Sequence, residues 1–146
     1  MKAKRFNSSC LCLQTRRADR ILTQLYDSFI KPTGLKSTQY GLLRCINNLH
    51  HPCLADISAT MCMDQTTVSR NIAKLEKGGF ISTSPAASDP RKTDIIITQY
   101  GREKMKDAEM AWEKAQQTVK RQMGKDDFEQ LYSLLNKIAE VVEYNE

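Results

Sequence analysis

The sequence of 146 residues lacks several features that mark large classes of protein. It has no run of eighteen or more apolar residues, so we expect no transmembrane helix and no membrane partner. Residues 1–5 are largely basic, but a polar stretch follows them instead of the apolar core of a secretion signal, which predicts a cytoplasmic protein. The five cysteines are odd in number and have no framework-like spacing, which predicts reduced thiols rather than structural disulfides.

Groups that enzymes use for catalysis are also scarce. The chain has two histidines, His50 and His51, no glycine-rich phosphate loop and no Ser/His/Asp set. A thiol oxidoreductase would carry C-x-x-C at a helix start after a strand, whereas Cys10 and Cys12 form a C-x-C before a helix. We therefore expect no enzymatic activity and no cofactor.

The other cysteines fit no standard metal site. The spacings of Cys45, Cys53 and Cys62 match no zinc pattern, and we predict that these residues pack between helices. His50 and His51 lie beside Cys53 and could be read as metal ligands, although a histidine pair before proline more often forms an exposed turn. We expect no metal, and a site at these residues is the alternative.

The net charge of +5 suits a polyanionic partner, but the charge is unevenly distributed. Basic and acidic residues number nine and three in residues 1–60, five and four in 61–100, and eight and ten in 101–146. The positive excess therefore lies mainly outside the central region. The placement of individual cations is better evidence than the total.

Residues 64–79 read as a helix with an unusual exposed face. Asp64 is a good N-cap, and Gly78-Gly79 supplies the stop. At about 100° per residue, one buried stripe is predicted at Val68, Ile72 and Leu75. The outward positions are then Thr66, Arg70, Ala73 and Lys77, flanked by Gln65, Thr67, Ser69 and Lys74. Hydrogen-bonding groups near the start and cations further along are what a DNA recognition helix needs, whereas a solvated surface helix is the plainer alternative.

A β-hairpin is predicted next. Residues 80–84 and 93–98 are strand-like in composition, and residues 85–92 between them contain two prolines and no buried-looking residue. Arg91 and Lys92 therefore lie at or beside an exposed tip, where a guanidinium suits a narrow minor groove of DNA. Asp89 could orient Arg91 by a charge-assisted hydrogen bond. A solvated turn with incidental charges is the alternative.

These residues resemble the multiple-antibiotic-resistance regulator (MarR) family of bacterial transcription factors. The resemblance is carried by residues 64–70, residues 75–81, Asp89-x-Arg91 and Thr98-x-x-Gly101, and element order extends it over nearly the whole chain. It implies a winged helix-turn-helix and repression relieved by a signal. One departure is Ser82-Thr83, which stands where many members carry an arginine on the first wing strand.

The fold class expected is mainly α with a small β-hairpin wing, in one domain. Helices are predicted at about 11–30, 37–49, from Leu54 to Met61, from about Gly101 to Met123, and after Gly124. We assign 37–98 to the DNA-binding part, and 8–31 and 99–146 to dimerisation helices. Ser37 is expected to cap the second helix. The predicted DNA contacts are Ser37, Gln65, Thr66, Thr67, Ser69, Arg70, Lys74, Asp89, Arg91 and Lys92.

Several of the predicted helices, the last above all, are too apolar for so short a chain to cover alone. We predict a homodimer that places two recognition helices roughly one DNA turn, about 34 Å, apart on a near-palindromic double-stranded operator. The alternatives are a monomer in which these helices pack together, and a winged-helix module that binds protein instead of DNA.

The signal to which such a regulator would respond is predicted less directly than its DNA binding. A helix beginning near Cys12, with Arg16 one turn on, favours the thiolate form. Residues 12–40 also resemble the organic-hydroperoxide-sensing branch of the family, which implies that Cys12 reacts with peroxide and bonds to the partner chain's Tyr26, although Arg16 replaces a second expected tyrosine. Cys10 and Cys12 as packing residues are one alternative. Another is a small aromatic or phenolic ligand in a pocket lined by Arg16, Arg20 and Trp112.

Overall fold

The computed structural model describes residues 6–86 and 93–143. The elements in chain order are α1 (Leu11–Ile30), the short 3-10 helix η1 (Lys31–Thr33), α2 (Ser37–Leu49), α3 (Leu54–Met61), α4 (Gln65–Lys77), β1 (Ile81–Pro85), β2 (Thr93–Ile97), α5 (Gln99–Met123) and α6 (Lys125–Glu143). This confirms the predicted mainly helical fold with one hairpin. None of the described helices is both long and apolar enough to cross a membrane.

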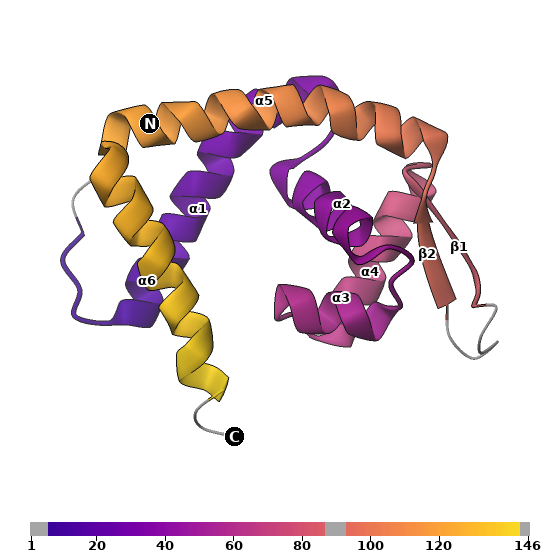
Figure 1. Ribbon diagram of the computed structural model, residues 1–146, viewed down its shortest axis with the longest axis horizontal. Helices are drawn as coiled ribbons and strands as arrows, with labels where there is room; N and C mark the ends of the chain where they lie inside the picture. Colours follow the sequence, from indigo (N-terminus) through magenta and orange to yellow (C-terminus); the bar gives the residue numbers. More distant parts are fainter. Residues whose placement is uncertain (1–5, 87–92, 144–146) are drawn as a thin grey trace.

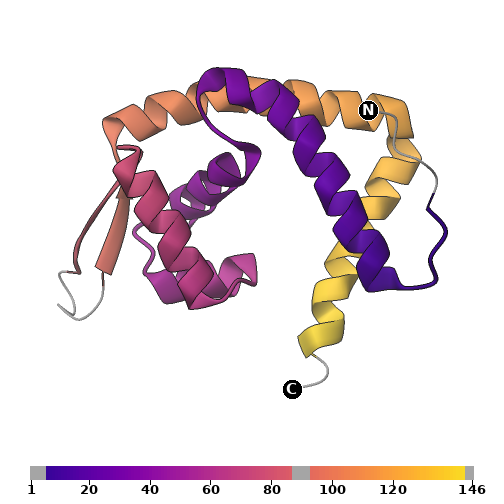
Figure 2. The ribbon, with the colours of Figure 1, turned by 180° about the vertical axis from the view of Figure 1, so that it is seen from behind.

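The long helix α5 connects two groups of elements (Figure 1). The helices α2, α3 and α4 and the hairpin gather under its N-terminal half, while α1 and α6 extend from its other half on the same side. Seen from behind, α1 crosses α5 and runs away from it (Figure 2), and α1 and α5 are in contact. The region between residues 37 and 98 is therefore a compact unit attached to α5.

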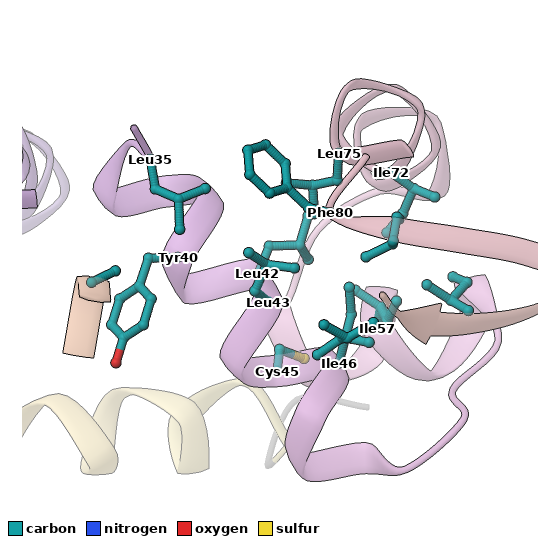
Figure 3. Packing of buried hydrophobic residues seen from close by; sticks show 14 of the residues in the cluster. Leu35, Tyr40, Leu42, Leu43, Cys45, Ile46, Ile57, Ile72, Leu75 and Phe80 are labelled. Carbon is teal, nitrogen blue, oxygen red and sulfur yellow. The ribbon is translucent and has the colours of Figure 1, made fainter. Parts of the chain in front are cut away.

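One hydrophobic core holds that unit together (Figure 3). Leu43 of α2, Ile57 of α3 and Leu75 of α4 are fully buried, as are Ile81 and Ile95 of the hairpin. Burying one such side chain stabilises the fold by about 1.5–3 kcal/mol. Because every element of the unit contributes, a shift of α4 relative to the hairpin would open this core.

The hairpin pairs Ile81 with Ile97, Thr83 with Ile95 and Pro85 with Thr93. β1 therefore extends one residue further than predicted, to Pro85, and starts at Ile81 instead of Phe80. A proline is tolerated at the end of an edge strand, where its missing N–H costs no ladder bond. Ile95 and Ile97 are buried and Ile96 is exposed, so one face of the ribbon covers the core.

The start of α2 differs from the prediction. Ser37 is the first helical residue, and the N-cap is Lys36, whose N–H donates to Gln39 Oε1 at 2.9 Å. The reason is a contact from another helix: both the N–H and the hydroxyl of Ser37 donate to Asp27 Oδ1 of α1, at 2.8 and 2.7 Å. Ser37 is therefore held by a carboxylate instead of capping the helix itself.

The cysteines are distributed unequally. Cys45 is buried in the core, as predicted, and Cys53 is half-buried as the N-cap of α3. The packing role predicted for Cys62 is wrong, because its side chain is exposed in the left-handed turn that ends α3, at φ 49°. His50 and His51 are exposed in the turn after α2, and no cluster of metal ligands occurs within the described ranges.

Candidate nucleic-acid interface

The helix α4 begins as the sequence predicts. Asp64 Oδ1 accepts the N–H of Thr67 at 2.9 Å, and Oδ2 accepts the Thr67 hydroxyl at 2.6 Å. These two hydrogen bonds hold the pKa of the Asp64 carboxyl below its ordinary value. A carboxylate ionised at neutral pH thus anchors the first turn, and Thr67 is half-buried because its hydroxyl serves the cap.

The predicted outward face of α4 is open to solvent. Gln65, Thr66, Ser69, Arg70 and Lys74 are exposed, while Val68, Ile72 and Leu75 are buried. Within residues 6–86 and 93–143, no carboxylate forms an ion pair with Arg70 or Lys74. Polar donors at the start of the helix and cations further along are therefore available to a partner molecule.

The turn between α3 and α4 fixes the angle of the exposed helix. The N–H of Met63 donates to the carbonyl of Ser58 at 3.1 Å, and the Ser58 hydroxyl donates to the carbonyl of Met63. Cys62 between them adopts the left-handed conformation. α3, this turn and α4 together form the helix-turn-helix predicted from the sequence.

The hairpin is attached to both neighbouring helices at one junction. Thr98 Oγ1 donates to the carbonyl of Gly79 at 2.6 Å and accepts the N–H of Gly101 at 2.9 Å. The Thr98 N–H donates to the carbonyl of Phe80 at 3.1 Å, and the Phe80 ring stacks on Tyr100 with centroids 5.5 Å apart. These contacts therefore tie the end of α4, the start of β1 and the start of α5 together.

A contact that the sequence did not reveal joins α4 directly to β1. Glu76 Oε1 accepts the N–H of Thr83 at 3.1 Å and the Thr83 hydroxyl at 2.5 Å. The two residues are seven apart and lie on different elements, so no helical or strand periodicity relates them. The predicted contacts Asp89, Arg91 and Lys92 lie outside the described residues.

Ser37 is the predicted contact outside α4 and the hairpin. Its partner Asp27 also forms an ion pair with Lys31 at 3.2 Å. Burial opposes ionisation of Asp27, but the Ser37 and Lys31 donors outweigh burial, and the pKa of the carboxyl lies below its ordinary value. The Ser37 hydroxyl is half-buried with its proton committed to Asp27, so only its acceptor lone pairs remain for a partner.

The residues predicted to sense a signal are not all brought together. α1 begins at Leu11, so Cys10 is its N-cap and Cys12 lies in its first turn, and both thiols are exposed. Tyr26, about four turns further on, donates its hydroxyl proton to Gln116 Oε1 of α5 in the same chain. Burial and then the neighbouring Tyr132 raise the pKa of Tyr26, which keeps this hydroxyl protonated.

A pocket beside Arg44 is lined by residues other than those predicted for the ligand site. This pocket of about 260 Å³ opens between α2 and α5 and is lined by Tyr40, Arg44, Asn47, Asn48, Arg102, Met105, Lys106 and Glu109. Trp112 lies just outside, where it stacks under the Arg44 guanidinium at 4.4 Å, while Arg16 and Arg20 are exposed on α1 and absent from this lining. A sequence pattern that could have predicted Arg44 as a pocket residue is the spacing of Tyr40, Arg44 and Asn47, which places them on one face of α2.

Comparison with known proteins gives a consistent picture. A sequence model of the MarR family matches residues 35–93. The HTH-type transcriptional regulator BilQ of Clostridioides difficile is 24% identical over 112 residues, which cover 77% of this chain and 76% of that protein. The M. tuberculosis transcriptional regulator MosR, solved in complex with DNA, is 28% identical with a TM-score of 0.84, covering 94% of this chain and 99% of that one. A mutant of E. coli MarR complexed with operator DNA shares the fold at 16% identity and a TM-score of 0.80, covering 88% and 92%.

Proposed function

Because the chain belongs to the MarR family of transcriptional regulators, we propose that it binds double-stranded DNA as a homodimer through α4 and the hairpin. The observation that carries this proposal is the exposed face of α4, where Gln65, Thr66 and Ser69 precede the exposed cations Arg70 and Lys74. Side chains near the helix start would meet base edges in the major groove. Arg70 and Lys74 would contact the phosphates, whereas Ser37, whose donors are committed to Asp27, has no proton to offer a phosphate oxygen.

Apolar side chains left exposed in one chain support the dimer. On α6, these are Tyr132, Leu134, Leu135, Ile138 and Val141, and on α1 they are Leu11, Leu13 and Ile21. Exposed apolar side chains in this number on a protein of this size call for a partner surface. A second copy that covers it would place two α4 helices about 34 Å apart on a near-palindromic operator.

The DNA-binding proposal is tested with the promoter next to the protein's own gene, measured at several salt concentrations. We expect binding of a specific duplex that falls steeply as salt rises, because phosphate contacts release counterions. Arg70→Ala should weaken binding to every duplex, whereas Gln65→Ala should reduce the preference for the operator over random DNA. Equal binding of operator and random duplexes by the parent protein would contradict the proposal.

For the signal we propose oxidation of Cys12, which would make the protein a repressor released by peroxide. The Cys12 thiolate would attack the peroxide, giving a sulfenic acid and releasing an alcohol or water. Exposure of Cys12 in the first turn of α1, where a peroxide can reach the thiol, supports this choice. A direct hydrogen bond from Tyr26 to Cys12 of the same chain is disfavoured, because the Tyr26 hydroxyl donates to Gln116.

The thiol proposal is tested by measuring operator binding before and after peroxide, in the parent and in Cys12→Ser. Peroxide should abolish binding by the parent and leave Cys12→Ser bound. Cys10→Ser is the matched control, because Cys10 lies two residues away and is equally exposed. Binding by the reduced and treated parent at the same affinity would return both cysteines to a packing role.

A small anionic aromatic ligand is the second candidate signal, and the pocket between α2 and α5 favours it. Its walls bring Arg44, Arg102 and Lys106 together against one carboxylate, Glu109. Arg44 is held in place over Trp112 and Tyr40. Release of DNA by salicylate in the parent, but not in Arg44→Met, would support this signal and would leave Cys12 unnecessary for it.

A further inference from the structure

Glu76 is an acidic residue near the C-terminal end of α4, between Lys74 and Lys77. It lies in the last turn of α4, where the negative end of the helix dipole repels an anion. It also lies on the element that, under the proposed function, approaches the phosphates of DNA, where each added negative charge weakens binding. The carboxylate is exposed, and two hydrogen-bond donors partly offset these effects.

The offset is the pair of hydrogen bonds from Thr83. At 2.5 Å, the contact between the Thr83 hydroxyl and Glu76 Oε1 has the length of a charge-assisted bond. The Thr83 N–H adds a second donor at 3.1 Å. A single carboxylate oxygen therefore accepts both donors of one residue, which fixes the position of β1 along and across the end of α4.

The hairpin needs such a fixing point. The sheet consists of β1 and β2 within the described residues, and a two-stranded ribbon leaves backbone donors on its outer edges without strand partners. The junction at Thr98 holds only the base of the hairpin, beside Phe80 and Gly101. Thr83 lies three residues beyond Phe80, opposite Ile95, and donates two hydrogen bonds to Glu76 of α4.

We propose that Glu76 is a positioning residue that sets the pose of the hairpin relative to the recognition helix, with Thr83 as its partner. Thr83 thereby supplies a polar contact between β1 and α4. This inference rests on the proposed function, since it assigns Glu76 a part in DNA binding through the hairpin. The carboxylate assists binding even though its charge alone opposes it.

Because the charge and the positioning role of Glu76 act in opposite directions, the direction in which operator affinity changes on substitution of Glu76 distinguishes them. Glu76→Ala removes a negative charge near DNA, so a role limited to charge predicts equal or tighter operator binding. Positioning predicts binding that is about tenfold weaker, as the hairpin loses its pose. Glu76→Gln also removes the charge but keeps an oxygen acceptor for both Thr83 donors, so it should bind at least as tightly as the parent.

Thr83 gives an independent pair of variants. Thr83→Val keeps the shape and the N–H but loses the hydroxyl, and it should weaken operator binding. Thr83→Ser keeps both donors and should bind like the parent. Because neither residue belongs to the buried core, all four variants should unfold cooperatively at temperatures close to the parent's, and this is checked by circular dichroism.

The same four variants are compared by footprinting at saturating protein. Glu76→Ala and Thr83→Val should lose hydroxyl-radical protection at the flanks of the operator, where the hairpin would lie, and keep methylation protection in the major groove. Equal or tighter binding by Glu76→Ala, or uniform loss of both kinds of protection, would overturn the inference. Failure of the parent itself to bind any operator would instead overturn the proposed function.

Discussion

Replacing Gly101 with alanine tests whether the junction between the hairpin and α5 is as close as the structure shows. A Cβ built on Gly101 would lie 2.0 Å from the carbonyl oxygen of Phe80 and 2.9 Å from Ile97 Cγ2. Contacts of a real Cβ essentially never fall below 3.0 Å. The Phe80 carbonyl would therefore have to retreat, although it is held there by the Thr98 N–H at 3.1 Å.

The expected cost follows from these contacts. Overpacking of this kind costs about 1–3 kcal/mol, and loss of the Thr98 hydrogen bond adds about 1 kcal/mol. Alanine in place of glycine inside a helix returns about 1 kcal/mol. The net effect expected for Gly101→Ala is a destabilisation of about 1–3 kcal/mol, which combines the two costs and the gain.

Gly41 is the matched control within the same chain. It also lies inside a helix, α2, but a Cβ there would have no atom within 4 Å. Gly41→Ala should therefore show only the helix-propensity gain and stabilise the protein by about 0.5–1 kcal/mol. The two variants carry the same chemical change, so opposite changes in their free energies of unfolding isolate the effect of the Phe80 contact.

The assay is urea denaturation of parent, Gly101→Ala and Gly41→Ala at one protein concentration, followed by circular dichroism. Holding the concentration fixed matters because association contributes to the apparent stability of a dimer. If Gly101→Ala unfolds at the same urea concentration as Gly41→Ala, or later, the proposed contact between α5 and the Phe80 carbonyl is refuted.

Three further predictions concern the cap, the cation and the two kinds of apolar residue. Asp64→Ala should lower the melting temperature at neutral pH, while Asp64→Asn keeps the cap. The folded pKa of Asp64 is depressed. The extra stability of the parent over Asp64→Ala should therefore be complete above the ordinary aspartate pKa range and vanish as pH falls through the folded pKa, as read from melting curves. Arg70→Ala should reduce the slope of log affinity against log salt by about one, measured by fluorescence anisotropy, and an unchanged slope would remove Arg70 from the phosphate contacts. Leu43→Ala, at a fully buried position, should destabilise the fold by about 2–5 kcal/mol in urea melts, whereas Leu134→Ala, at a half-exposed position of α6, should mainly raise the dimer dissociation constant in sedimentation experiments.

Much of the fold was predictable because it depends on neighbours along the chain. Asp64 caps α4 through Thr67, three residues away, and the buried stripe of α4 follows from the helical period. The motif Thr98-x-x-Gly101 likewise closes within one helical turn. For these elements, residue type and spacing carry the physical information, and the structure agrees with the sequence.

Contacts between elements were decided only by the tertiary structure. The sequence could not show that Asp27 of α1 would hold Ser37, that Glu76 of α4 would hold Thr83, or that Arg44 and Arg102 would line one pocket. These meetings depend on the angles and distances at which packed elements cross, and periodicity within one element says nothing about those. By itself the sequence determined which helices and strands form and which faces they bury; packing of those faces into one core decided which polar groups meet outside it.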